Sequence, residues 1–166
     1  QQGLVDYFLK LAEMHDLPWM LYHIPGRAGV NVSVDTLVEI QKNSENFVGM
    51  KHAANDLSFV SDCIQVLGTQ FRIFVGLEEL SLPMMAVGAC GLMNAVGNLK
   101  PGQLVEMVES IWNNDLIKAK ALHYNLLEIN KSVFYDTNPI PIKYMMRKIG
   151  LIPTNEHRLP MLPASP

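Results

Sequence analysis

The stretch Phe47-Val-Gly-Met-Lys51-His-Ala53 is a short apolar run that ends in a lysine. Turn-forming residues bound the run on both sides, with Asn43-Ser-Glu-Asn46 before it and Asn55-Asp56 after it. A run of this length between such bounds is typical of a buried parallel strand. We therefore predict a strand whose carboxyl end carries the amine of Lys51.

Strand alternation assigns the side chains of this run to two faces. Phe47, Gly49 and Lys51 are expected on one face, and the residues between and after them, including His52, on the other. Because Gly49 has no side chain, we expect empty volume below the lysine stem. The alternative is a strand-terminal lysine that simply reaches solvent, since lysine is rarely buried.

Strand and helix patterns alternate on both sides of this run. Further strands are predicted at residues 17–25, 71–76 and 90–96, with a loop at 26–29. Helices are predicted at 4–15, from Ser33 to about 43, at 57–67, from Glu78 to about 87, and from 101 to about 150 with breaks at 113–114 and 138–141. Four short strands that alternate with helices indicate repeated βα units, and therefore an α/β fold with a parallel sheet.

The composition is that of an ordinary globular chain. Of its 166 residues, 49% are hydrophobic and 17% are charged, which is enough apolar material for a substantial core. The formal net charge is −3 and the basic residues are scattered, so we predict no nucleic-acid partner. No apolar run approaches the roughly 18 residues of a membrane span, and no leader pattern opens the chain. Cys63 and Cys90 are too few for a disulfide framework, so a cytoplasmic, reducing location is expected.

Two residues stand where parallel α/β folds place their chemistry. Tyr22 and Lys51 each lie at the carboxyl end of a predicted strand. Apolar neighbours such as Phe47 and Met50 favour the neutral, nucleophilic form of the lysine, which can form a Schiff base. A nearby tyrosine hydroxyl both donates and accepts, and can carry protons during that reaction. The alternative for Tyr22 is a half-buried strand aromatic.

Arg27 follows Pro25-Gly26 just beyond the Tyr22 strand. A guanidinium in that place can hold a carboxylate with two parallel hydrogen bonds, although a solvated loop arginine is the alternative. The five histidines show none of the paired spacings of a metal site. We therefore predict neither a metal nor a cofactor.

Motifs along the whole chain occur in a characteristic order: Tyr22-His-Ile-Pro-Gly-Arg27-Ala-Gly-Val-Asn31, Val48-Gly-Met-Lys51, Gly76, Gly88-Ala-Cys-Gly-Leu-Met-Asn94, Asn138-Pro-Ile-Pro-Ile-Lys143 and Arg158-Leu-Pro160. Together they resemble the dihydrodipicolinate synthase and N-acetylneuraminate lyase family. The resemblance implies a TIM (β/α)8 barrel with a C-terminal helical extension. A full barrel takes about 250 residues, so the chain is expected to match its second half, in residues 1–100, with the last barrel helix and the extension in 101–166.

The resemblance also implies a class I aldolase that holds pyruvate as a lysine imine, without a cofactor. By this resemblance Lys51 is the Schiff-base lysine, Tyr22 the proton relay, and Gly76 and Met93 line the pyruvate pocket. Arg27 is typical of the synthase branch, in which it binds the carboxylate of the aldehyde partner. The implied activity is therefore like that of 4-hydroxy-tetrahydrodipicolinate synthase, in a homo-oligomer such as a dimer or homotetramer.

The resemblance implies that parts of the active site lie in the other half of the barrel. These are a Gly-Thr-Thr-Gly-Glu loop for the pyruvate carboxylate and a second relay tyrosine from a neighbouring subunit. We therefore expect the chain to begin partway through a barrel and to be inactive alone.

Four places depart from the family pattern. His23 stands where asparagine is usual, Ala28 where threonine is usual, His52 where an acid often follows the lysine, and Leu77-Glu78-Glu79 where Gly-Asp-Asp is common. These departures leave two alternatives open. One is a divergent aldolase or dehydratase that acts on a sugar acid or another 2-keto acid, and the other is a non-catalytic member that binds a keto acid.

Overall fold

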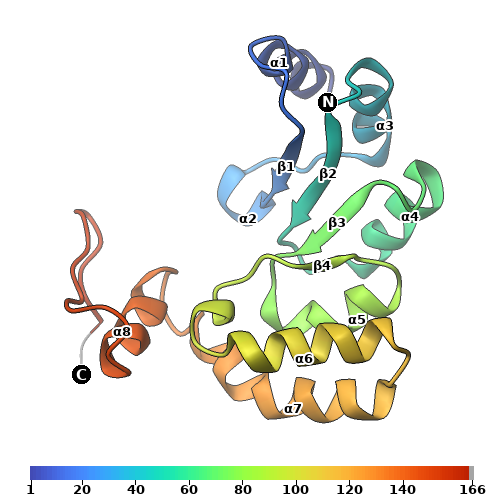
Figure 1. Cartoon of the computed structure of the whole chain (residues 1–166). Helices are drawn as coiled ribbons and strands as arrows, with labels where there is room; N and C mark the ends of the chain where they lie inside the picture. The colour runs from blue at the N-terminus through green and yellow to red at the C-terminus, as the bar shows by residue number, and fades with distance from the viewer. Residues whose placement is uncertain (165–166) are drawn as a thin grey trace. The chain divides into compact units, whose positions relative to one another are not determined.

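Four parallel strands form the sheet of this protein, seen here in a computed structural model that describes residues 1–164. The strands are β1 (Trp19–His23), β2 (Phe47–His52), β3 (Arg72–Val75) and β4 (Gly91–Leu92), and they lie in this order across the sheet (Figure 1). Every pair of neighbours is parallel, which confirms the predicted α/β sheet. The strands are shorter than the apolar runs predicted, most of all β4, which pairs over only two residues.

Helices precede and connect the strands in the first of two units, which covers residues 1–93. They are α1 (Gln2–Ala12), α2 (Pro25–Ala28), α3 (Val34–Asn43), α4 (Leu57–Leu67), the 3-10 turn η1 (Glu78–Leu80) and α5 (Ser81–Ala86). Side chains cap the helices that follow β1 and β2. The Ser33 hydroxyl accepts from the Thr36 amide at 3.2 Å, and the Asp56 carboxylate accepts from the Phe59 amide at 2.8 Å.

Two predictions for these connections are wrong. The segment 26–29, predicted as a loop, is largely the short helix α2, which Gly29 ends in the left-handed conformation at φ 69°. The helix predicted to open at Glu78 starts as a 3-10 turn and becomes α-helical only at Ser81. Glu78 itself is buried rather than exposed, with 1% of its surface accessible.

A bulge interrupts the alternation of β2. Trp19 is paired with Phe47 and Met20 with Gly49, so Val48 is an extra residue on β2. A Cβ atom at Gly49 would lie 2.1 Å from the carbonyl oxygen of Arg72 on β3. The empty volume predicted beside Gly49 is therefore absent, because the backbone of the neighbouring strand occupies it.

Aromatic side chains join the amino-terminal ends of the strands. The rings of Phe8 and Trp19 are 6.0 Å apart between centroids, those of Trp19 and Phe47 4.5 Å, and those of Phe47 and Phe71 5.1 Å. The Trp19 indole N–H also donates to the Ser44 hydroxyl at 3.2 Å. Each such aromatic pair contributes about 0.5–1.5 kcal/mol beyond its buried area. This end of the sheet is thus held by packing.

The core of the first unit lies between the sheet and its helices. Its fully buried side chains include Leu37 and Ile40 of α3, Met50, Ile73 and Val75 of the strands, and Val60 and Cys63 of α4. Because α3 and α4 each direct one apolar face to the strands, the helix-facing side of the sheet is closed to water.

The second unit, from Asn94 onward, is helical. It contains η2 (Val96–Asn98), α6 (Pro101–Trp112), α7 (Leu116–Ser132) and α8 (Ile140–Lys148). The break predicted at 113–114 is confirmed. The break predicted at 138–141 lies earlier, at 133–139, because α7 ends at Ser132 and α8 already begins at Ile140. The assignment of the two units to a barrel and its extension stays a prediction.

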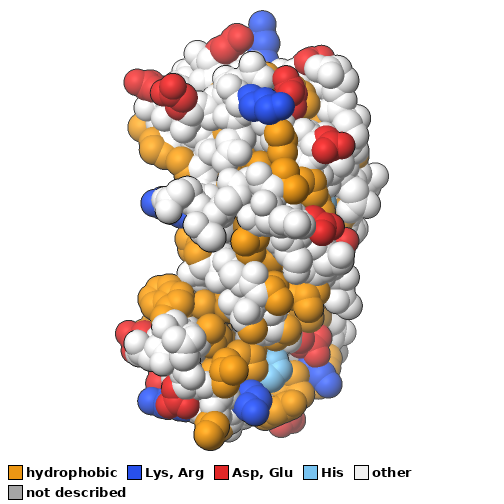
Figure 2. All heavy atoms as spheres, turned by 90° about the vertical axis from the view of Figure 1, so that its right-hand side faces the viewer, with side chains coloured by type: hydrophobic (Ala, Val, Ile, Leu, Met, Phe, Trp, Pro, Cys, Tyr) orange, Lys and Arg blue, Asp and Glu red, His pale blue; other side chains and the backbone are white. Residues whose placement is uncertain are grey.

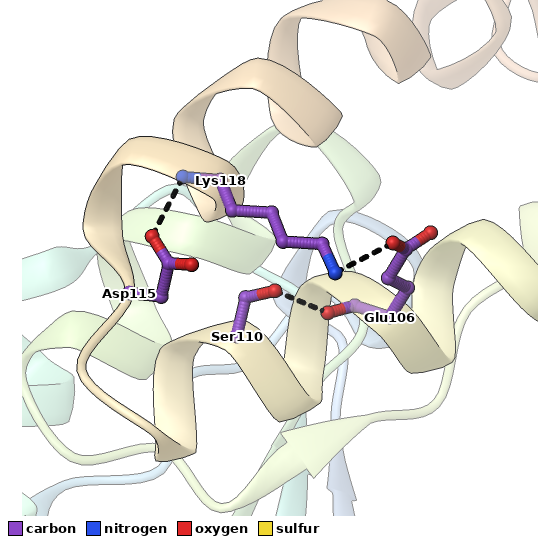
Figure 3. A network of polar contacts seen from close by, with 4 residues as sticks. All are labelled: Glu106, Ser110, Asp115 and Lys118. Atoms are coloured by element: carbon purple, nitrogen blue, oxygen red, sulfur yellow. Dashed lines mark hydrogen bonds and ion pairs between the residues drawn. The ribbon is translucent and has the colours of Figure 1, made fainter.

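Polar contacts connect α6 to α7 within this unit (Figure 3). Lys118 Nζ lies 2.7 Å from the Glu106 carboxylate, and this contact raises the pKa of Lys118. The Lys118 backbone amide donates to the Asp115 side chain at 3.0 Å, which caps α7. Both partners of the ion pair are about half exposed, so it contributes little to stability.

The surface has no large field of one charge on the face drawn in Figure 2. Basic side chains there are scattered among acidic and apolar ones. Among residues 1–164, no helix is long and apolar enough to cross a membrane.

Candidate functional site

Tyr22 and Lys51 face each other across neighbouring strands. They are register partners of β1 and β2, and Lys51 Nζ lies 4.2 Å from the centroid of the Tyr22 ring. This is the geometry of a cation–π contact. The Tyr22 side chain is 51% exposed and Lys51 is partly exposed, so a small molecule can reach both groups. The structure thus brings together the two residues predicted to be catalytic.

Gly76, directly after β3, makes room for the lysine stem. A Cβ atom at this position would lie 2.9 Å from Lys51 Cε and 2.9 Å from the Ala53 side chain. The Gly76 amide donates to the His52 carbonyl oxygen at 2.7 Å, which fixes the backbone close to the lysine. The missing side chain that seats Lys51 therefore belongs to Gly76 and not, as the sequence suggested, to Gly49.

Arg27 and Met93 lie at the same edge of the sheet. Arg27 is exposed on α2, which begins two residues after β1 (Figure 1). Met93 follows β4, donates its amide to the Val75 carbonyl at 2.9 Å, and has a 40% exposed side chain. Because the strands are parallel, all five predicted site residues gather at their carboxyl ends. The individual roles assigned to them stay predictions.

A pair of buried histidines lies on the opposite face of the same two strands. His23 and His52 are the next register partners after Tyr22 and Lys51, and their Nδ1 atoms are 3.1 Å apart. The Phe59 ring of α4 contacts both, at 5.1 Å from the His23 ring and 5.3 Å from the His52 ring between centroids. The backbone amide of Val32 approaches His23 Nε2 at 3.4 Å.

Burial keeps both imidazoles neutral. It lowers the pKa of His52 to about 4, helped by repulsion from His23 and opposed by the Asp56 carboxylate. Burial also lowers the pKa of His23, against the side chains of Asn31 and Asp56. At neutral pH the pair is therefore an uncharged hydrogen bond between two strands.

The two thiols are poor nucleophiles. Burial and nearby carboxylates raise the pKa of Cys63 to about 12, and burial raises the pKa of Cys90. Within residues 1–164, no three His, Cys, Asp or Glu side chains are placed to hold a metal ion. Lys51, by contrast, is a partly exposed amine at the carboxyl edge of the sheet.

Sequence reasoning missed the histidine pair. The sequence places His52 on the face opposite Lys51 and marks both histidines as departures from a family pattern, but it does not indicate that the two rings meet. A signal was present, because each directly follows a predicted site residue and alternation sends it to the opposite face. Their contact depends on the register between β1 and β2, which the sequence does not display.

The sequence model of the dihydrodipicolinate synthetase family matches residues 1–166. A 4-hydroxy-tetrahydrodipicolinate synthase from Thermus thermophilus is 40% identical over all of this chain and 56% of its own length. A crystal structure of dihydrodipicolinate synthase from Aquifex aeolicus superposes with a TM-score of 0.96 at 34% identity, over 99% of this chain and 56% of that one.

A third similar protein is the chloride-inhibited dihydrodipicolinate synthase from Acinetobacter baumannii, solved in complex with pyruvate. It superposes with a TM-score of 0.93 at 31% identity, over 99% of this chain and 56% of that one. The chain thus spans just over half the length of the relatives it matches. Since the family match covers every residue, the chain belongs to the dihydrodipicolinate synthetase family.

Proposed function

We propose that this chain carries the reactive lysine of a class I, pyruvate-dependent aldolase. The observation that carries the proposal is the placement of Lys51 Nζ over the Tyr22 ring at the carboxyl edge of a parallel sheet. The family supports the choice of substrate, since a similar protein is solved in complex with pyruvate. Lys51 is the nucleophile, and Tyr22 is the residue that moves protons.

The proposed reaction starts with attack of the Lys51 amine on the pyruvate ketone. The carbinolamine that forms loses its hydroxyl as water, with a proton supplied through the Tyr22 hydroxyl, and becomes an iminium ion. The iminium draws electrons from the pyruvate methyl group, which loses a proton to give an enamine. The enamine carbon then attacks the aldehyde carbonyl, whose oxygen takes up a proton. Water finally hydrolyses the product imine and frees Lys51.

Arg27 supports an aldehyde that carries an acid group. Its exposed guanidinium stands on α2, immediately beyond the Tyr22 strand, where it can bind a carboxylate with two parallel hydrogen bonds. Gly76 and Met93 flank the imine, Gly76 through its close contact with the lysine stem. The proposed activity is therefore that of a 4-hydroxy-tetrahydrodipicolinate synthase.

A divergent member of the family is the second candidate. The buried pair of His23 and His52 favours it, since these positions depart from the asparagine and acid expected there. Such an enzyme would use the same imine at Lys51 on a sugar acid or another 2-keto acid. Tests with several aldehydes separate the two candidates, because imine formation with pyruvate is common to both.

We also propose that the chain supplies the second half of a (β/α)8 barrel. It spans 56% of its relatives, and within residues 1–164 β1 pairs with β2 alone. The other edge of β1 is thus available to a further strand, which a closed barrel requires. The remaining half would add groups for the pyruvate carboxylate, so the chain alone would be inactive, and the whole protein would form a homo-oligomer.

Borohydride trapping with pyruvate tests the proposal. In the native protein that carries this chain, reduction should attach one pyruvate unit to Lys51, as located by peptide mass mapping. Lys51→Arg should abolish the adduct, because a guanidinium keeps the charge but forms no stable imine. Lys42→Arg, at an exposed position on α3, is the matched control, and in this variant Lys51 should take up the pyruvate unit as in the wild type. An adduct on another lysine, or none, would overturn the aldolase assignment.

A further inference from the structure

The buried histidines lie directly behind the proposed catalytic pair. Along β1 and β2, the register pair Tyr22 and Lys51 is followed by the pair His23 and His52, and successive side chains point to opposite faces. Both histidines are at least 95% buried. The reaction proposed above uses neither ring. Burial of two polar rings is costly unless they are hydrogen-bonded, and these two are bonded to each other.

The hydrogen bond between the two rings uses a single ring proton, because both imidazoles are neutral. The ring that donates carries its proton on Nδ1, and the ring that accepts carries its proton on Nε2. The Val32 amide and the Asn31 side chain both approach the His23 ring. The backbone groups of Ala54 and Asp56 raise the pKa of His52. His52 Nε2 itself has no partner at normal hydrogen-bond distance.

The same backbone connects the histidine pair to the lysine. The Ala53 amide donates to the His23 carbonyl at 2.9 Å, and the Gly76 amide donates to the His52 carbonyl at 2.7 Å. Gly76 in turn contacts the Lys51 stem, since a Cβ on it would lie 2.9 Å from Lys51 Cε. A change in the separation of the two histidines therefore shifts the backbone that carries the amine.

We propose that the hydrogen bond between His23 and His52 positions Lys51 against Tyr22, by fixing β1 to β2 immediately behind them. The histidines are positioning residues, because neither ring reaches the face on which the amine lies. The effect on catalysis rests on the proposed function, whereas the effect on the position of Lys51 does not. Phe59, which contacts both rings from α4, prevents the pair from separating toward the helix.

The groups that act on the pair come from two segments, α4 with its cap and the loop before α3. The Asp56 carboxylate at the start of α4 affects both imidazoles, the Asn31 side chain hydrogen-bonds His23 from the loop before α3, and Phe59 of α4 covers both rings. Asp56 is already used as the cap of α4, where it accepts from the Phe59 amide. None of these groups substitutes for the bond between the two histidines.

Substitution of His23 by two side chains of similar size separates hydrogen bonding from packing. His23→Leu removes the hydrogen-bonding ring and leaves His52 Nδ1 without its partner, whereas His23→Asn retains a side-chain amide that can donate or accept near the position of Nδ1. A displacement of about 1 Å at a reacting group can cost about 10²-fold in rate. We expect kcat to fall roughly 10- to 100-fold in His23→Leu, with KM for pyruvate nearly unchanged, and to recover in His23→Asn.

Val60→Ala is the matched control for a loss of stability. Val60 is fully buried on α4 but makes no side-chain hydrogen bond, so its truncation destabilises the same layer without breaking the pair. Its kcat should stay close to that of the wild type. Equal losses of kcat in Val60→Ala and His23→Leu, at matched stability, would overturn the proposal, as would a failure of His23→Asn to restore the rate.

Two NMR measurements test the position of Lys51 without catalysis. Nitrogen-15 spectra of the histidines should show one ring of the pair protonated at Nδ1 and the other at Nε2. After reductive ¹³C-methylation of the native protein, the Lys51 methyl signal, assigned with Lys51→Arg, should be shifted by the Tyr22 ring current. That shift should disappear in His23→Leu and return in His23→Asn. An unchanged shift in His23→Leu would refute positioning even if borohydride traps pyruvate, and the expected shifts without trapping would refute only the aldolase.

Discussion

The two faces of the sheet differ most where β1 and β2 end. On one face Tyr22 and Lys51 are accessible, and the amine lies 4.2 Å from the ring centroid. On the other face, one residue further along each strand, His23 and His52 are buried, hydrogen-bonded to each other and covered by Phe59. One pair of strands thus holds a proposed reactive face, with Tyr22 and Lys51, and a proposed supporting face, with His23 and His52, because alternation sends neighbouring side chains in opposite directions.

The same comparison separates the two ends of the strands. At the amino ends, the aromatic rings of Phe8, Trp19, Phe47 and Phe71 pack against one another in this order. None of these four residues belongs to the proposed site. At the carboxyl ends, Lys51 keeps a partly exposed amine next to Gly76. In parallel α/β folds the amino ends serve stability and the carboxyl ends carry function, and the proposed site residues of this chain lie at the carboxyl ends.

The largest expected effect comes from removing the hydroxyl on the reactive face. Tyr22→Phe should lower kcat of the native protein by about 10²- to 10⁴-fold, because it deletes the proton relay. The phenyl ring still packs beneath the Lys51 amine, so the thermal midpoint should change little. Steady-state kinetics and thermal unfolding measure the two quantities. A normal rate would assign Tyr22 to strand packing alone.

Acid should weaken the supporting face. The pKa of His52 is about 4 in the fold, below the ordinary value of 6.5, so the unfolded chain binds more protons between these values. Stability from this group is complete above pH 6.5 and is lost as the pH falls toward 4. The loss is on the order of 3 kcal/mol at about 1.4 kcal/mol per pH unit, and His23 adds to it in the same direction.

Urea unfolding at several pH values measures this dependence. His52→Asn, which does not titrate in this range, is the control and should show a flatter decline in the free energy of unfolding between pH 6.5 and 4. If the wild type and His52→Asn decline in parallel, the neutral state of His52 is not what links stability to pH. Carboxylates contribute equally to both proteins and cancel in the difference.

Arg27, at the outer rim of the reactive face, is proposed to bind the carboxylate of the aldehyde. Arg27→Ala should reduce kcat/KM for aldehydes that carry a carboxylate, such as aspartate semialdehyde, by roughly 10- to 150-fold, since a charge-assisted hydrogen bond contributes about 1.5–3 kcal/mol. Trapping of pyruvate at Lys51 should be nearly unchanged. Kinetics with charged and neutral aldehydes check this. An equal loss on both kinds of aldehyde would show that Arg27 only supports α2.

Two glycines offer the finest test, because each packs against a different neighbour. In Gly76→Ala the new methyl group meets Lys51 Cε and the Ala53 side chain at 2.9 Å, so the flexible lysine must move. In Gly49→Ala it meets the Arg72 carbonyl oxygen at 2.1 Å, which is backbone. We expect Gly76→Ala to slow imine formation at a cost of about 1–3 kcal/mol in stability, as overpacking typically does.

Gly49→Ala should instead lower the free energy of unfolding more than the rate of imine formation, because the β3 backbone cannot move away without breaking hydrogen bonds of the sheet. Trapping rates and urea midpoints of the two variants check the contrast. A Gly76→Ala protein that traps pyruvate at the normal rate would mean that the lysine stem has room elsewhere.

Much of the fold followed from local pattern. Apolar runs bounded by turn residues predicted all four strands, and capping residues placed the starts of α3 and α4. The parallel sheet then brought the ends of β1 and β2 to one edge, so the meeting of Tyr22 with Lys51 could be predicted without coordinates. These features depend on periodicity and chain direction, which are properties of the sequence.

Other features depended on contacts between segments distant in the sequence. The bulge at Val48 shifts the register between β1 and β2. Gly76 rather than Gly49 accommodates the lysine stem, because the Arg72 backbone of β3 lies against Gly49 and Lys51 Cε lies against Gly76. A bulge is set by hydrogen bonding between two strands, so it has no local signature here.

The sequence by itself determined a parallel α/β sheet with a lysine and a tyrosine at its carboxyl edge. Only the tertiary structure decided that His23 and His52 would form a buried hydrogen bond behind them, and that Glu78 would be buried. The physical reason is that burial of a polar side chain depends on which helix covers it and on the register of the strand beside it. The covering helix and the strand register are set by the packing of the whole unit. The local sequence does not show them, because polar side chains occur in similar short patterns on exposed surfaces.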